Sequence, residues 1–418
     1  MILGDKVMKR LGILLVCIGV LSPITGCGGK KLSRSSEREA LVEATNTFTF
    51  DLHRQLVEDG TTGTGGNLFS SPLCASMALA LAYAGAREQT AQQMEKVLGL
   101  ESLKQRVHPA YHDLLVSLRQ GAESHDLYLG SRLWAHEGLK FRDEFARTLR
   151  QCYGEKPAAV DFEHDLAGAH DAVARWVRDT THGRIKDAAV SQGVDTLTRM
   201  LLTSVIYFKG RWKYEFNPDA TDDEEFHLLT GENATVSMMH QAGRFKYAFL
   251  DGCKLLEMPY TGEEVSMTLI LPNGSLPDFE EGLTWKTVAN WMDKMEVTKD
   301  VDVKIPRFRM QTRMPLTEVL QAMGLTDVFI NPDFSAMTGG TAGPPISAID
   351  QEGYIDVNEE GTEAYVVTRG SWFIRSGKET PVFHADHPFV FLIRDLRTGS
   401  ILFIGRFVDP RHQAEAES

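Results

Sequence analysis

Cysteine is scarce in this sequence, and its placement suggests neither a metal site nor a disulfide framework. The 418 residues include five cysteines, none in a CxxC or Cys/His metal spacing, and two of the five lie within the first 27 residues. Small secreted domains that depend on disulfides carry denser cysteine sets. We therefore expect a fold held by its hydrophobic core, and 43% apolar residues are enough to build one.

Concentrated positive charge is also missing. The chain carries 44 Lys and Arg residues against 57 acidic ones, giving a net charge of −13, and the basic residues are spread along the sequence. Proteins that bind nucleic acids gather positive charge on one face or stripe. The charge pattern therefore argues against a nucleic-acid partner.

Recognisable catalytic motifs are absent. There is no GxSxG, HExxH or P-loop sequence, and the GxG tripeptides at 26–28 and 63–65 lack the third glycine of a dinucleotide-binding loop. His108 and His112 have helical i, i+4 spacing, but no third metal ligand can be named for them. We expect that the protein is not an enzyme and needs no metal or other cofactor. A lipid-tethered hydrolase is an alternative that the missing nucleophile motif disfavours.

The first 26 residues have the three-part layout of an export signal. Three basic residues precede the apolar run Leu11–Leu21, which is shorter than the about 20 residues that cross a bilayer. The sequence ITGC at 24–27 resembles a bacterial lipobox, in which the cysteine becomes the lipid-modified first residue. We predict a signal peptide over 1–26, then lipidated Cys27 and a flexible spacer over 27–40. The protein is expected to be exported and anchored at a bacterial membrane or cell surface. The alternative is a plain cleaved signal, with a periplasmic or extracellular product.

Helical periodicity dominates the first half of the chain and β-prone runs dominate the second. Apolar spacing predicts helices over 48–57, 75–83, 107–118 and 166–177, with one strand at 127–134. Strands are predicted at 200–208, 254–258, 265–271, 301–305, 389–393 and 401–407. The run 200–208 is apolar without alternation, which is typical of a strand covered on both faces. With no repeat, this order predicts an α+β architecture. The length allows two or three domains, and the lack of an interior linker keeps one large domain as an option. We also expect a monomer.

The segment after Val357 begins acidic and then becomes β-prone. Alternation places small or branched side chains on one face and larger or charged ones on the other. The first face comprises Thr362, Ala364, Val366 and Thr368, and the second comprises Glu363, Tyr365, Val367 and Arg369. The first face is suited to a core, and the second to solvent or an overlying helix.

Four motifs in order make the chain resemble a serpin, a protease inhibitor that acts as a suicide substrate. They are NLFSSP at 67–72 with the apolar run 78–86, IYFKGRW at 206–212, EEGTEA at 359–364, and HPFVFLI at 387–393 with GSILFIGR at 399–406. The resemblance covers residues 41–410 and leaves a short tail at 411–418. It implies one large domain in which helices, mainly from the first half, pack on three β-sheets. It also implies an exposed reactive loop over about 359–381.

The resemblance further implies a reactive bond. In this family the hinge glutamate lies sixteen residues before the residue that precedes the scissile bond, and counting from Glu359 leads to Arg375-Ser376. The implied hinge residues are Glu359, Gly361, Thr362, Glu363, Ala364, Val366 and Thr368. Arginine pairs with a carboxylate at the base of a specificity pocket. The implied partner is therefore a trypsin-like serine protease, held as a covalent acyl complex while the cleaved loop inserts into the main sheet.

Two departures from the family pattern bear on the insertion step. The polar cluster below the sheet opening usually has two serines, an asparagine and a histidine; here Ser71, Cys74, Ser204 and Gln351 align with them. Trp372 falls on the inward face, where its bulk is expected to strain the last part of insertion. The alternatives are a non-inhibitory serpin that acts as a carrier or scaffold, and an inhibitor of a papain-like cysteine protease.

Overall fold

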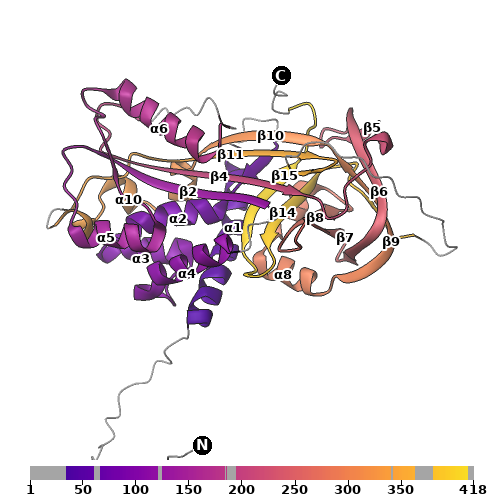
Figure 1. Cartoon of the computed structure of the whole chain (residues 1–418), viewed down its shortest axis with the longest axis horizontal. Helices are drawn as coiled ribbons and strands as arrows, with labels where there is room; N and C mark the ends of the chain where they lie inside the picture. Colours follow the sequence, from indigo (N-terminus) through magenta and orange to yellow (C-terminus); the bar gives the residue numbers. More distant parts are fainter. Residues whose placement is uncertain are drawn as a thin grey trace, which may run out of the picture.

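The computed structural model describes residues 34–60, 66–120, 125–183, 185, 194–339, 342–362 and 380–412. Helices from the first half pack beneath a long central sheet, and a second sheet lies beside them (Figure 1). The α-helices are α1 (Arg34–Asp59), α2 (Pro72–Tyr83), α3 (Glu88–Leu98), α4 (Val107–Arg119), α5 (Asp143–Tyr153), α6 (Leu166–Thr180), α7 (Leu276–Glu281), α8 (Trp285–Asp293), α9 (Thr317–Ala322), α10 (Asp327–Ile330) and α11 (Ser335–Thr338). None of these helices is both long enough and apolar enough to cross a membrane.

The central sheet is built around a strand that is buried on both faces. Its order is β10 (Phe308–Pro315), β11 (Ala348–Asn358), β12 (Gly361–Thr362), β4 (Met200–Arg211), β2 (His125–His136) and β3 (Ala158–Val160). Leu202 and Ile206 of β4 belong to the main core, whereas Leu201 and Val205 pack in a separate cluster with Trp176 of α6. This arrangement confirms the buried strand that the sequence predicts for 200–208.

The second sheet is a single continuous sheet, whereas the resemblance implies two separate sheets in addition to the central one. Its order is β1 (Leu68–Ser70), β15 (Ile401–Phe407), β14 (Phe389–Asp395), β8 (Val265–Pro272), β7 (Cys253–Pro259), β6 (Asn233–Leu250), β9 (Glu296–Pro306) and β13 (Val382–His384), and β5 (Thr221–His227) pairs with β6. Strand β6 runs through both halves and shifts register between Gly243 and Phe245. The expectation of three sheets is therefore corrected to two among the described strands, because one long strand links the two halves.

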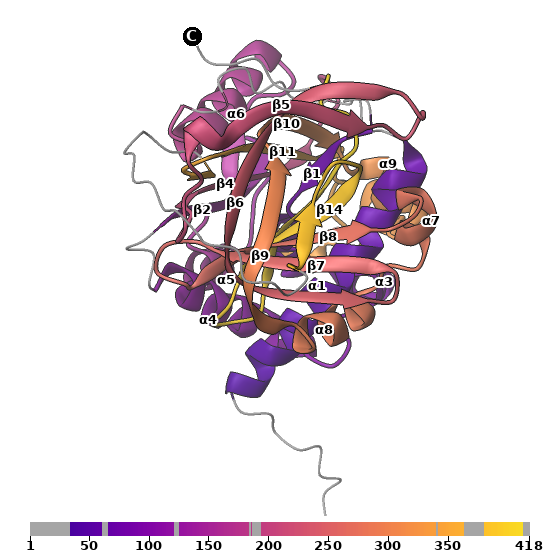
Figure 2. The same cartoon turned by 90° about the vertical axis from the view of Figure 1, so that its right-hand side faces the viewer.

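Helix α2 explains how the two sheets share a core. Its sequence is apolar all round, and every residue from Pro72 to Ala82 is buried, as expected for a helix surrounded by protein. It contacts β2 and β4 on one side and β15 on another. Helix α6 covers the opposite face of the central sheet, and Figure 2 shows α6 and α8 at opposite ends of the molecule.

The predicted helices and strands are all present, but several further elements were not expected. They include α3, α5, α8, β5, β6, β10 and β11. In α3 only Thr90, Met94 and Leu98 are buried, and in β5 only Phe226 is buried. Such polar elements carry too weak an apolar pattern to be recognised in the sequence.

The expected spacer over 27–40 is wrong for its last seven residues, which form the start of α1. Glu37 is only 4% exposed, although it lies within the predicted spacer. Its carboxylate accepts two hydrogen bonds from Arg106, at 2.8 and 2.9 Å. A bidentate pair between arginine and a carboxylate is one of the stronger polar contacts in proteins. Arg106 therefore holds residues 34–40 in place, although their composition is that of a linker.

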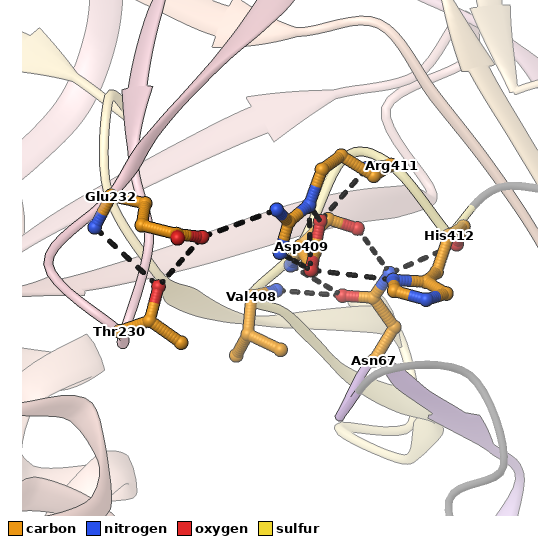
Figure 3. Close-up of polar contacts among 7 residues, drawn as sticks. All are labelled: Asn67, Thr230, Glu232, Val408, Asp409, Arg411 and His412. Atoms are coloured by element: carbon orange, nitrogen blue, oxygen red, sulfur yellow. Dashed lines mark hydrogen bonds and ion pairs between the residues drawn. The ribbon is translucent and has the colours of Figure 1, made fainter.

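A polar cluster fixes the carboxyl-terminal segment after β15 (Figure 3). The Asn67 side chain accepts hydrogen bonds from the backbone of Val408 and Asp409 and donates to the carbonyls of Asp409 and His412. Arg411 joins the Asp409 carboxylate to Glu232 in the β5–β6 turn. Residues 408–412 are thus tied to the residue that precedes β1 and to the β5–β6 turn of the second sheet.

Candidate functional site: the hinge and the sheet-opening cluster

The hinge lies where the two middle strands of the central sheet separate. Over their first six residues β11 and β4 pair directly and in parallel, from Ala348 opposite Leu201 to Gly353 opposite Ile206. Beyond this point β12 lies between the two strands and is antiparallel to both of them. The chain that leaves β11 therefore already occupies the top of the gap between β11 and β4.

Thr362 is buried at the inner face of this gap. It is 1% exposed, and its Oγ1 shares a hydrogen bond of 2.8 Å with the Tyr260 hydroxyl. Burial raises the pKa of Tyr260 well above its ordinary value, so this phenol stays protonated. Trp212 stacks on Tyr260 with ring centroids 4.5 Å apart and donates its indole N–H to the Asn358 carbonyl. The side of Thr362 predicted to face a core does so.

Gly361 occupies a position with no room for a side chain. A Cβ atom there would lie 2.1 Å from the Gly210 carbonyl oxygen and 2.7 Å from Arg211 Cα. Both neighbours are backbone atoms of β4, so a larger residue would push β12 out of the sheet. The glycine of the hinge motif is thus explained by close backbone approach.

Glu359 anchors the turn that precedes the hinge. Its carboxylate accepts hydrogen bonds from both Nε and a terminal nitrogen of Arg307, and one of 2.7 Å from Thr221 Oγ1. Burial opposes ionisation, yet these hydrogen bonds outweigh it and lower the pKa of Glu359 below its ordinary value. Glu359 therefore remains charged and ties the hinge to β5 and to the β9–β10 turn.

The four residues of the sheet-opening cluster lie together below the hinge. Gln351 accepts from the Ser71 backbone N–H at 2.8 Å, and its amide donates to the Ser71 carbonyl at 2.7 Å and to Ser204 Oγ at 3.3 Å. Ser71 Oγ caps α2 by accepting from the Cys74 N–H. Burial raises the pKa of the Cys74 thiol to about 12, so it stays protonated. Gln351 on β11 and Ser204 on β4 thus join the two strands that insertion would have to separate.

Several residues that support the hinge were not among the sequence candidates: Thr221, Tyr260 and Arg307. Each is distant in sequence from Glu359 and lies on a different strand or turn, so no local pattern marks it. Trp212 is the last residue of the IYFKGRW motif, and its place in that motif is the only feature of the sequence that points to a role at the hinge.

Other sequence candidates either lie elsewhere or are not described. Among the hinge residues, Glu363, Ala364, Val366 and Thr368 lie outside the described residues, as do the bond Arg375-Ser376 and Cys27. His108 contacts Tyr153, with its Nδ1 2.7 Å from the Tyr153 hydroxyl, and burial lowers the pKa of His108 to about 4. No cluster of three or more His, Cys, Asp or Glu residues suited to a metal is found in the described part of the chain.

Comparison with known proteins identifies the family. The family model described as serpin (serine protease inhibitor) matches residues 43–410. The chain belongs to the serpin family. It is 36% identical over 384 residues to an uncharacterized serpin-like protein of Thermococcus kodakarensis, covering 90% of this chain and 88% of that protein. It is 35% identical over 383 residues to human leukocyte elastase inhibitor, covering 89% of this chain and all of the inhibitor.

The fold agrees with solved serpin structures. A crystal structure of uncleaved ovalbumin superposes with a TM-score of 0.79 and 28% identity, covering 89% of this chain and all of that one. The single α+β domain implied by the resemblance is thereby confirmed, and the protein belongs to a family of protease inhibitors.

The expectation that the protein is not an enzyme is corrected by the family comparison. That expectation rests only on missing catalytic motifs, whereas the comparison supplies a positive assignment. The matched family is described as serine protease inhibitors, and the relative from human is named as an inhibitor of elastase. The activity supported for this chain is therefore inhibition of proteases, stated at the level of the family.

Proposed function

We propose that this serpin is an irreversible suicide inhibitor of trypsin-like serine proteases, acylated at Arg375-Ser376. The observation that carries the proposal is the hinge itself. Gly361 and Thr362 already pair with both β4 and β11, while below them these two strands meet in parallel. A cleaved loop that continued in this register would separate the parallel pair.

The register states where each loop residue would lie after insertion. Continuing from Thr362, residues 363–371 would lie opposite residues 209–201 of β4 and 356–348 of β11. One parallel ladder would be replaced by two antiparallel ladders, which are slightly more stable per residue. Even-numbered residues would face inward like Thr362, with Thr368 opposite Ser204 and Gln351.

The inhibitory chemistry would be supplied by the protease. Its serine attacks the Arg375 carbonyl, an ester forms, the Arg375–Ser376 peptide bond breaks, and the new amino terminus at Ser376 leaves. Insertion of nine residues at about 3.3 Å each would then carry the attached protease on the order of 30 Å. A catalytic serine works only within tight geometric tolerance, so distortion of its site would prevent water from hydrolysing the ester.

The deciding experiment is incubation of the mature chain with trypsin, followed by denaturing electrophoresis. A covalent complex that resists denaturant is expected, together with its loss in Arg375→Ala. Cleavage at Arg375 without any complex would refute the inhibitory proposal and favour the carrier or scaffold alternative. A complex with papain but not with trypsin would move the target to cysteine proteases.

We also propose that the protein is exported and anchored through lipid on Cys27. Support comes from the lipobox-like ITGC sequence and from α1, which begins at Arg34, seven residues after Cys27. More than one acyl chain is needed for stable anchoring. Metabolic labelling with radioactive palmitate and membrane fractionation test this, and Cys27→Ser is expected to remove the label and release the protein. A Cys27→Ser protein that stays in the membrane fraction would contradict the anchor.

A further inference from the structure

A cavity lies beside the segment that follows β4. We name it the bulge pocket, because its wall includes residues 244–246 at the register shift of β6. Its volume is about 420 Å³, within the ~300–1,000 Å³ usual for small-molecule sites. The rest of its lining comes from residues 213 and 214 after β4, from β7 and the turn that follows it, from β9 and from Leu396 after β14.

The charge of the bulge pocket is positive, although the chain as a whole carries −13. Lys213 pairs with Glu263 at 2.7 Å, and Lys246 pairs with Glu257 at 2.8 Å. The exposed guanidinium of Arg244 has no ion pair or hydrogen bond with any other residue in the described parts of the chain. One cation is thus left over at the rim, and a guanidinium binds carboxylate, sulfonate or phosphate oxygens in pairs.

The wall beside these charges is apolar. Phe245 is 2% exposed and meets the Tyr214 ring edge to face at 6.0 Å, while Tyr214 is 43% and Val297 53% exposed. These exposed surfaces offer an alkyl or aromatic body a place to pack. Exposed apolar side chains next to an unpaired cation form a site for a ligand that is both anionic and apolar.

The bulge pocket and the hinge share one segment of chain. The Trp212 N–H donates to the Glu360 carbonyl and the Phe216 N–H to the Glu359 carbonyl, each at 2.8 Å. Between these two residues, Lys213 and Tyr214 line the pocket. A ligand that immobilises Lys213 and Tyr214 would therefore also restrain the two amides that hold the start of the hinge.

We propose that the bulge pocket binds a small organic anion with an apolar body, such as an aryl or alkyl sulfonate or carboxylate, and that occupancy restrains the hinge through residues 212–216. The proposal does not depend on the protease target or on the trapping step, because both of its parts are measurable without protease.

Calorimetric titration of the intact mature chain with naphthalene-2-sulfonate tests the binding. Saturable binding of one molecule is expected, weakened about tenfold or more in Arg244→Gln and partly retained in Arg244→Lys, since a charged pair is lost in the first only. Arg178→Gln on α6 is the matched control, because it removes another exposed arginine from a helix that lies away from β6, β7 and β9 (Figure 1), and it should bind as the parent does. Inorganic sulfate and neutral naphthalene-2-methanol should each bind at least about tenfold more weakly, because each lacks one of the two features. Equal binding by Arg244→Gln, or no saturable binding, would overturn the proposal.

Hydrogen exchange at the Trp212 and Phe216 amides tests the link to the hinge. With naphthalene-2-sulfonate at saturation we expect exchange to slow about threefold or more at these two amides and not in α4, because local opening is what exchange reports. Unchanged protection at both amides in the saturated protein would overturn the coupling.

Discussion

Ala364→Arg is the sharpest test of strand insertion, because the register of β12 predicts where residue 364 would go. In the inserted loop it would lie opposite Phe208 and Ile355, which are 3% and 1% exposed and face the main core. An arginine there would be buried without a partner, at a cost of about 3–5 kcal/mol. Residue 364 is the next inward position after Thr362, so this cost falls early in insertion. A barrier raised by that amount slows insertion by between about a hundredfold and a few thousandfold.

The assay compares trapping with simple cleavage when Ala364→Arg meets trypsin. We expect Arg375 to be cut at the parental rate while the covalent complex disappears, because hydrolysis of the acyl-enzyme now outruns insertion. Glu363→Arg is the matched control: it adds the same side chain one position earlier, on the outward face between Asp356 of β11 and the solvent-accessible Lys209 of β4, where the guanidinium can stay hydrated, and it should still trap. If Ala364→Arg yields as much complex as the parent protein, the loop does not enter the sheet in this register and the reasoning fails.

Three further changes test the described contacts. Burial raises the pKa of Glu352 to about 7 despite Arg313. The contribution of this group to native stability is therefore greatest below about pH 4.5 and is lost as the pH rises through 7. The thermal midpoint should fall between pH 5 and 8 in the parent protein and fall less in Glu352→Gln, and an equal fall in both proteins would contradict this. Thr362→Val and Tyr260→Phe each remove one partner of the hydrogen bond between these two residues. A double-mutant cycle on the free energy of unfolding should give a coupling energy of about 1 kcal/mol. A coupling energy of zero would mean that this hydrogen bond does not stabilise the hinge. Asn67→Ala leaves the buried backbone N–H groups of residues 408 and 409 without their acceptor, which should destabilise the protein by about 2–4 kcal/mol in denaturant unfolding, whereas Asn233→Ala, at an exposed strand start, should cost little.

Much of the hinge was predictable because its requirements are local. The hinge is recognised because the sequence EEGTEA at 359–364 resembles the serpin hinge motif, and alternation correctly places Thr362 on the inward side. The partners of the hinge were not predictable, because Tyr260, Arg307 and Thr221 come from separate strands and turns brought together only by the fold.

By itself, the amino-acid sequence determined which segments are buried. The unbroken apolar run of β4 is typical of a strand covered on both faces. A helix that is apolar all round, such as α2, is typical of a helix inside the protein. Only the tertiary structure decided that β11 meets β4 in parallel below the hinge, that Gln351 and Ser204 join them, and that Arg244, at the register shift of β6, has no partner among the described residues. Burial follows from the composition of each segment. These contacts depend instead on how distant strands pair, and the local sequence pattern does not specify which strands pair or in which register.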